Sequence, residues 1–163
     1  MDQEQMYELY QKYHSPIYIY ALSLCKRKES AEDLVSETFI KAFSIDDTEG
    51  MKLKYWLLTV CRNLWIDKLR RSKTHQRSLP PLISEEEDPL LQLLKEERRR
   101  RLYRNIRRLP KHSAEILILY YFTGASLTEI ASILQISYTN AKTLLFRARI
   151  KLKKLFEEDD YEF

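Results

Sequence analysis

The chain has 163 residues, of which 44% are hydrophobic and 32% charged, and its formal net charge is +4. Two glycines leave few positions for the tight turns that sheets need, so we expect helices throughout one or two small domains. The sequence contains no signal peptide and no apolar stretch of 18 residues, so we expect a cytoplasmic protein rather than a secreted or membrane-spanning one.

The residue types that usually carry catalysis or bind metals are sparse. Cys25 and Cys61 lie far apart, and neither has a Cys or His at metal-ligand spacing. We expect both to be buried structural thiols, because free cysteines usually pack as small hydrophobic residues. The histidines lie in unrelated segments, and the chain has no phosphate-binding loop or nucleophile motif. The sequence therefore argues against an enzyme and predicts no metal and no cofactor.

The charges are distributed unevenly along the chain. Residues 1–71 contain 11 basic and 11 acidic residues, residues 72–94 contain 2 and 4, and residues 95–163 contain 15 and 9, giving net charges of 0, −2 and +6. Within the last segment, residues 138–154 contain six basic residues and no acidic one. Since a merely solvated face usually mixes both signs, this stretch predicts binding to a polyanion such as nucleic acid.

The N-terminal part of the chain is predicted to be helical. Hydrophobic periodicity predicts helices over residues 6–13 and 17–24, separated by Ser15 and Pro16, which suit an N-cap and a first helical position.

A third helix is expected from Ser30, where Asp33 completes a near capping box. One face of this helix is apolar and the other is acidic, with Glu32, Asp33 and Glu37. Helix charges are most often only solvated, so these residues by themselves leave the role of the acidic face open.

A long helix is predicted over residues 55–71, after a polar loop at residues 44–54. One face of this helix is apolar. A second face is formed by hydrogen-bonding and charged side chains: Thr59, Arg62, Asn63, Asp67 and Arg70. Beside Trp56 and Trp65, this face suits contact with sugar, phosphate and unstacked bases, although tryptophans at helical spacing more often belong to a core.

Residues 72–94 are predicted to be a flexible linker, because the helical pattern is lost in a stretch with three prolines and four consecutive acidic residues. The linker divides the chain into domains 1–71 and 95–163. A helix is expected over residues 90–109. The apolar run 116–122 fits a helix or a strand, and Gly124 placed as a cap favours the helix.

The strongest local signal is the capping box of Ser126 and Glu129, which starts a short helix. Residues 135–137 form a turn, and Ser137 caps the next helix, so the pair is predicted to be a helix-turn-helix. The outward face of the second helix carries side chains suited to a DNA groove: Thr139, Lys142, Thr143, Phe146 and Arg147. A helical hairpin inside a bundle is the alternative, and the basic excess favours nucleic-acid binding.

Two stretches of the sequence, in order, resemble the extracytoplasmic-function (ECF) sigma factors of the sigma-70 family of bacterial RNA polymerase sigma subunits. Residues 30–43, SAEDLVSETFIKAF, are similar to the polymerase-binding helix of the family, and residues 55–71, YWLLTVCRNLWIDKLRR, to its minus-10 recognition helix. Residues 116–155 are similar to its minus-35 recognition domain. The resemblance implies an all-α protein with sigma region 2 at residues 1–71 and sigma region 4 at residues 95–163.

The function implied by the resemblance is to bind core polymerase and to direct promoter recognition, DNA opening and transcription initiation. The docking sites would be the clamp helices of the largest polymerase subunit and the flap of the second-largest. The implied clamp contacts are Glu32, Asp33, Leu34, Glu37 and Phe39. The implied minus-10 contacts are Arg62, Asn63, Asp67 and Arg70, with a flipped base held by the loop at residues 43–54. The implied minus-35 contacts are Thr139, Asn140, Lys142, Thr143, Phe146 and Arg147. An anti-sigma factor, often membrane-bound, is a further implied partner.

The chain departs from the family pattern at several positions. Gln135 stands where the family usually has Gly, Asn140 and Ala141 where it usually has Thr-Val, and Leu144 where Arg is frequent. We therefore expect an unusual promoter preference. The acidic residues 157–160 fit either a solubilising end or a contact for a regulator.

Two alternatives remain open at this level. A helix-turn-helix regulator that acts without polymerase would explain residues 113–155 but not the acidic helix or the face around Asn63. A sigma mimic that only sequesters an anti-sigma factor would explain the fold without needing the basic residues. The regulator should bind duplex DNA tightly alone, whereas the mimic should bind neither DNA nor polymerase.

Overall fold

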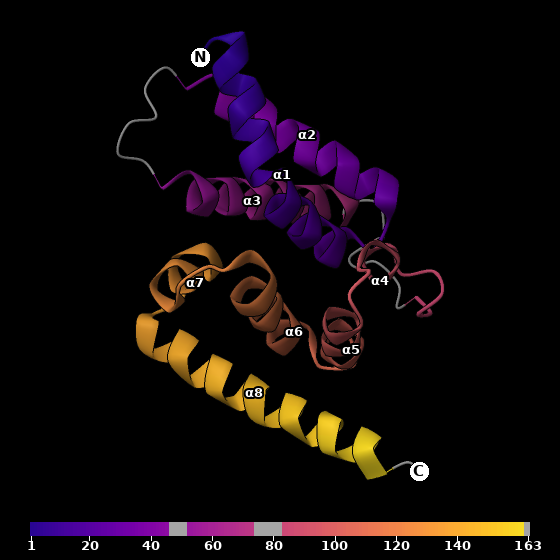
Figure 1. The fold of residues 1–163 in the computed structure, drawn as a ribbon. Coiled ribbons are helices and arrows are strands. Elements are labelled where there is room, and N and C mark those ends of the chain that lie inside the picture. The colour runs from indigo at the N-terminus through magenta and orange to yellow at the C-terminus, as the bar shows by residue number, and fades with distance from the viewer. Residues whose placement is uncertain (46–51, 74–82, 162–163) are drawn as a thin grey trace. The chain divides into compact units, whose positions relative to one another are not determined.

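The computed structural model describes residues 1–45, 52–73 and 83–161, and every regular element within those residues is helical (Figure 1). The chain divides into two compact units, Met1–Ile83 and Ser84–Phe163, which we call the N-terminal and C-terminal units. The all-α class with two helical domains is therefore confirmed. Loop residues 46–51 and linker residues 74–82 lie outside the described residues. The domain boundaries at residues 71 and 95 stay a prediction.

The N-terminal unit is built from three helices, α1 (Gln3–Cys25), α2 (Lys28–Phe43) and α3 (Leu53–Lys73), and each packs against the other two. Asp2 caps α1 by accepting a hydrogen bond from the Gln5 amide at 2.8 Å. The side chains that these helices bury most completely, each at most 2% exposed, include Ile17, Tyr20, Leu34, Phe39, Leu57, Leu58 and Cys61. Full burial stabilises the fold by about 1.5–3 kcal/mol for each large apolar side chain, which makes this interior the main source of stability.

The separate helices predicted for residues 6–13 and 17–24 are one continuous helix. Pro16 lies inside α1, where proline normally costs about 3 kcal/mol. Leu9 and Ile17, on either side of it, are both buried, and a break would separate them from the same apolar interior. Packing of α1 against α2 and α3 therefore outweighs the local preference of the proline.

Helix α2 begins two residues before Ser30, where the third helix was predicted to start. Lys26 adopts a left-handed conformation with φ 60° and ends α1, and the extended backbone of Arg27 starts α2 at Lys28. Ser30 therefore lies within the first turn of α2 rather than at its cap, and the backbone reversal at Lys26 sets the boundary.

The C-terminal unit contains α4 (Pro89–Leu93), α5 (Glu97–Ile106), α6 (Lys111–Ile118), the π-helical turn η1 (Leu119–Thr123), α7 (Leu127–Leu134) and α8 (Tyr138–Tyr161). The long helix α8 packs against α5, α6 and α7 (Figure 1). The apolar run at 116–122 is thus helical, and Gly124 ends it with φ 72°. Its lack of periodicity follows from burial, since residues 116–119 are all at most 2% exposed.

The single helix predicted over residues 90–109 is wrong, because the chain forms α4 and α5 with an extended break at Leu94. The Arg100 guanidinium donates hydrogen bonds to the carbonyl oxygens of Leu91 and, at 2.9 Å, of Leu94. These bonds satisfy backbone groups that the break leaves without helical partners. Helix α4 lies within the stretch predicted as linker and packs against α5.

A buried charged cluster holds α4 in place. The Asp88 side chain is fully buried and accepts hydrogen bonds from the Leu90 amide at 3.0 Å and the Tyr103 hydroxyl at 2.6 Å. The Arg107 guanidinium lies 3.4 Å from the same carboxylate. Burial, and then the neighbouring Asp88 charge, raises the pKa of Tyr103 well above its usual range. Asp88 thus caps α4 and ties it to α5.

Both cysteines are free and buried, as predicted. Burial raises the pKa of the Cys25 thiol to about 11 and that of the Cys61 thiol still further. Neutral thiols are poor nucleophiles, which fits a structural role. In the part of the chain that the structure describes, no helix is long and apolar enough to cross a bilayer, and no three His, Cys, Asp or Glu side chains gather as metal ligands.

Candidate functional site

The helix-turn-helix predicted from the sequence is present and is shaped by local hydrogen bonds. Ser126 and Glu129 form a reciprocal capping box, with N–O distances of 3.1 and 2.9 Å. Gln135 takes the left-handed conformation, with φ 58° and ψ 44°, and ends α7. The Ser137 hydroxyl then accepts a hydrogen bond from the Asn140 amide at 3.0 Å and caps α8. These bonds set the angle at which α8 leaves α7.

Small buried side chains bring α8 against its neighbours. Ala141 and Ala148 are completely buried, and Ala131 of α7 is 6% exposed. With these residues facing inward, the opposite face of α8 is exposed to solvent. All of the predicted minus-35 residues are exposed there: Thr139, Asn140, Lys142, Thr143, Phe146 and Arg147. Phe146 is 65% exposed and is among the most exposed large apolar side chains of the described residues.

An open groove of about 900 Å³ adjoins this face. The residues that line it are Tyr121, Lys142, Thr143, Leu145, Phe146, Arg149, Ile150, Leu152, Lys153 and Phe156. Sequence reasoning identified Phe146 but missed its apolar neighbours Tyr121 and Ile150, which are 39% and 42% exposed. The i, i+4 spacing of Phe146 and Ile150 could have indicated Ile150, whereas Tyr121 reaches the groove from η1 through the tertiary fold. This α8 groove therefore combines apolar surface with the cations Lys142, Arg149 and Lys153.

The predicted polymerase-binding residues lie on α2, the helix that contains Ser30, and they differ in burial. Glu32, Asp33 and Glu37 are exposed, whereas Leu34 and Phe39 are at most 2% exposed. The structure therefore places the two apolar residues under the face rather than on it. The Glu37 carboxylate lies 2.8 Å from the Lys68 ammonium of α3, which ties the face to the next helix. Glu32 lies near Tyr18, whose pKa is raised by burial and then by that negative charge.

The polar face of α3 presents the other predicted DNA contacts. Asn63, Asp67 and Arg70 are exposed, and Arg62 is half-buried. Asp67 and Arg70 form an ion pair at 3.8 Å. Trp65 is only 6% exposed and belongs to the core, which is the more common position for a tryptophan at helical spacing. The central residues of the predicted base-binding loop, 46–51, lie outside the described residues.

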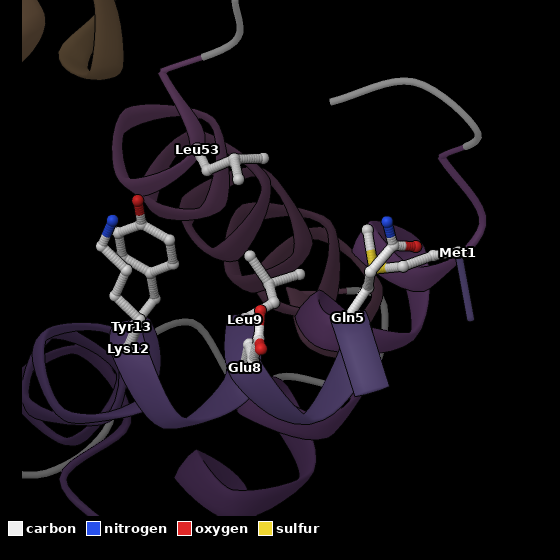
Figure 2. A pocket seen from close by; sticks show the side chains of 7 residues that line it. All are labelled: Met1, Gln5, Glu8, Leu9, Lys12, Tyr13 and Leu53. Carbon is white, nitrogen blue, oxygen red and sulfur yellow. The ribbon is translucent and has the colours of Figure 1, made fainter. Parts of the chain in front are cut away.

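A hollow of about 310 Å³ lies where α1 meets the start of α3 (Figure 2). Lys12 and Tyr13 stand at one end of it and Met1 and Gln5 at the other, with Leu53 above them. The remaining lining residues are Glu8 and Leu9. None of these residues was predicted to be functional.

Comparison with known families matches residues 9–75 to Sigma-70 region 2 and residues 99–152 to Sigma-70, region 4. Region 2 covers the acidic face and the polar face of α3, and region 4 covers most of the helix-turn-helix unit. The two matches occur in the order that the sequence predicted.

Curated relatives match nearly the whole chain. It is 36% identical to the ECF RNA polymerase sigma factor SigM of Bacillus subtilis, over 91% of this chain and 93% of that protein. It is 29% identical to the ECF RNA polymerase sigma factor SigX of the same organism, over 91% of this chain and 82% of that protein. A helix-turn-helix regulator without region 2 would not account for the match over the N-terminal part of the chain.

Solved structures share the fold. The sigma factor RpoE in complex with the anti-sigma factor NepR from Bartonella quintana matches with a TM-score of 0.68 and 24% identity, over 95% of this chain and 96% of that one. CnrH in complex with the cytosolic domain of CnrY matches with a TM-score of 0.66 and 22% identity, over 97% and 91%. Both likenesses concern the fold alone.

Proposed function

We propose specific roles for the surfaces of a chain that belongs to the extracytoplasmic-function sigma factors of the sigma-70 family. The chain is a non-enzymatic RNA polymerase sigma factor that directs transcription initiation, and sigma factors bind the polymerase core and promoter DNA. The proposal concerns which side chains make these contacts. The observation that carries it is the exposed basic face of α8, with Phe146 at its centre.

We propose that Glu32, Asp33 and Glu37 dock on the clamp helices of the largest polymerase subunit, and that Leu34 and Phe39 support this face from the interior. The support is the exposure of the three carboxylates together with the burial of the two apolar side chains. A rigid helix that presents several carboxylates favours a basic partner, and charge reversal at its centre should repel that partner.

Asp33→Arg tests the polymerase contact. The exposed position predicts normal folding, and the reversed charge should abolish assembly with core polymerase, measured by gel filtration of the mixture. Glu4→Arg makes the same charge change on an exposed residue of α1 and should leave assembly unchanged. Normal assembly of the Asp33 variant would remove this face from the interface.

We propose that the exposed α8 residues contact the minus-35 duplex and that Arg62, Asn63, Asp67 and Arg70 contact the minus-10 element. Lys142 and Arg147 are suited to phosphate or guanine, and Phe146 to a thymine methyl group. In the holoenzyme, Lys142→Ala and Arg147→Ala should weaken promoter binding and each reduce its salt slope by about 1. Lys95→Ala, an exposed change outside α8, is the control. Unchanged slopes for both α8 variants would refute the minus-35 contact.

Run-off transcription from a genomic DNA library, with bacterial core polymerase and with or without the protein, tests the function as a whole. New start sites that share two upstream elements are expected, and an absence of new starts would contradict it. The same experiment separates the sigma factor from a mimic, which should bind neither polymerase nor promoter. We place this activity in the cytoplasm, where core polymerase and chromosomal DNA meet.

Two further parts of the proposal concern organisation and regulation. We propose domains 1–71 and 95–163 joined by residues 72–94; the division between the compact units at residue 83 falls inside this stretch. Limited proteolysis should cut there and leave two resistant halves, and a single protected core would contradict it. We also propose an anti-sigma factor, often membrane-bound in this family, as a partner, and the flap of the second-largest polymerase subunit as a second docking site.

A further inference from the structure

Helix α8 carries its charges in two separate blocks. Residues 142–154 contain six basic residues and no acidic one, and residues 157–160 are Glu157, Glu158, Asp159 and Asp160. The first block faces solvent on the exposed side of the helix. The second block lies beside α5, against which α8 packs (Figure 1).

The acidic block is paired with arginines of α5 and the residues just after it. The Arg101 guanidinium lies 2.9 Å from the Asp160 carboxylate and 4.8 Å from the centre of the Phe156 ring. Arg108 lies 3.4 Å from Asp159 and 4.0 Å from Glu158. Both arginine side chains are nearly half-exposed, at 45% and 48%, so water and dissolved ions reach them.

The acidic block stands at the unfavourable end of its helix. The C-terminus of a helix carries partial negative charge, so carboxylates there destabilise the last turn. The last turn of α8 contains no basic residue to offset this effect. The contacts with Arg101 and Arg108 therefore hold the end of α8 in place, and an anion that competes for these arginines should release it.

We propose that Arg101 and Arg108 form a second phosphate-binding surface for duplex DNA, which the acidic end of α8 covers until DNA displaces it. Residues 158–160 then act as an intramolecular counterion that limits binding of the free protein to DNA. This surface lies on and just after α5, outside the minus-35 face of α8, and it goes beyond the proposed contact there.

The energetics allow the exchange. Exposed ion pairs contribute little to stability, so the contacts with residues 158–160 can be exchanged for phosphate at small cost. A guanidinium group binds phosphate through two parallel hydrogen bonds, and duplex DNA presents phosphates at high density. Since α5 packs against α8 within one unit, the arginines and the basic block of α8 belong to the same helical body. Removing the acidic charges should join the two basic surfaces.

The test is the salt dependence of binding of the full-length protein to a duplex of random sequence. The variant E158Q/D159N/D160N should bind several-fold more tightly at low salt, and its salt slope should be steeper by about 1.8, as two additional phosphate contacts predict. Adding R101Q and R108Q to this variant should return the slope to that of the original protein. R101Q/R108Q alone should change the slope little.

The matched control is E86Q/E87Q/E96Q, which removes three exposed acidic charges from the same unit. If the control steepens the slope as much as the variant at residues 158–160, the effect is one of net charge and the proposal is refuted. It is also refuted if the variant only lowers the urea midpoint, which indicates a purely structural contact. Lys142→Ala tests the minus-35 face separately. The contact at that face and the contact at Arg101 and Arg108 can therefore be refuted independently.

Discussion

The two units reach the same all-helical class with different interiors. The N-terminal unit buries apolar side chains and neutral polar groups, such as Cys61 and Thr38, whose hydroxyl donates to the Leu34 carbonyl oxygen at 2.8 Å. The C-terminal unit buries the Asp88 carboxylate and places the Arg107 guanidinium against it. The difference shows that the three-helix unit is held mainly by burial of apolar surface, whereas the C-terminal unit also uses the charged contact of Asp88 with Arg107, which docks its first helix.

The two units can be followed separately in one molecule. The chain has two tryptophans, Trp56 and Trp65, and both lie in α3 of the N-terminal unit. Tryptophan fluorescence therefore reports unfolding of that unit, while far-UV circular dichroism reports both. Urea unfolding followed by fluorescence and by circular dichroism therefore measures how a substitution in one unit changes the stability of each unit.

The largest expected effect is that of Asp88→Ala. The change removes the buried carboxylate that contacts Arg107 and Tyr103 and that caps α4, so we expect the C-terminal unit to lose about 3–5 kcal/mol. The dichroism transition should move to lower urea while the fluorescence transition stays in place. Glu86→Ala, an exposed change two residues earlier, should leave both transitions unchanged. Equal shifts in both signals would mean that the units unfold together.

A comparable effect in the opposite unit is expected from Leu57→Ala. Leu57 is completely buried in α3, and the cavity should cost the N-terminal unit about 2–5 kcal/mol. Here the fluorescence transition should shift, and the C-terminal unit should keep its midpoint. Ile40→Ala, at a position 64% exposed, is the control and should cost little. A small effect of Leu57→Ala would show that the interior can collapse around the missing side chain.

The two units should lose stability at different alkaline pH values, because different groups titrate in each. Cys25 has a folded-state pKa of about 11 against an ordinary value of 9.0, so the folded protein retains a proton that the unfolded chain releases. The N-terminal unit should therefore lose about 1 kcal/mol from this thiol between pH 8 and pH 10. The raised pKa of Tyr103 acts on the C-terminal unit only above its ordinary value of 10.0. Fluorescence-detected midpoints should fall first, and Cys25→Ala should reduce that dependence.

The smallest expected effect is a gain in stability from Gln135→Gly. Gln135 holds a left-handed backbone in the helix-turn-helix, a conformation that glycine adopts without steric cost. We expect the C-terminal unit to gain up to about 1 kcal/mol, seen as a higher dichroism midpoint at constant fluorescence midpoint. Ser132→Gly, at an exposed position inside α7, should instead destabilise it. A loss of stability in the Gln135 variant would mean that its side chain contributes a contact of its own.

The sequence predicted most securely what depends on neighbouring residues. The capping box at Ser126 and Glu129, the turn at residues 135–137 and the cap at Ser137 all follow from short-range hydrogen bonds, and the structure contains each of them. The exposure of the α8 face followed from helical spacing with Ala141 and Ala148 on the opposite side. Family membership also came from the sequence, because its motifs are local and occur in order.

Tertiary structure decided the features that join residues distant in the chain. It carried α1 through Pro16, divided α4 from α5 at Leu94, tied α4 to α5 through Asp88 and Tyr103, and set the acidic end of α8 against Arg101 and Arg108. Local preference opposed or did not indicate each of these arrangements. Their free energy comes from burial and charge pairing between separate helices, which no window of neighbouring residues contains.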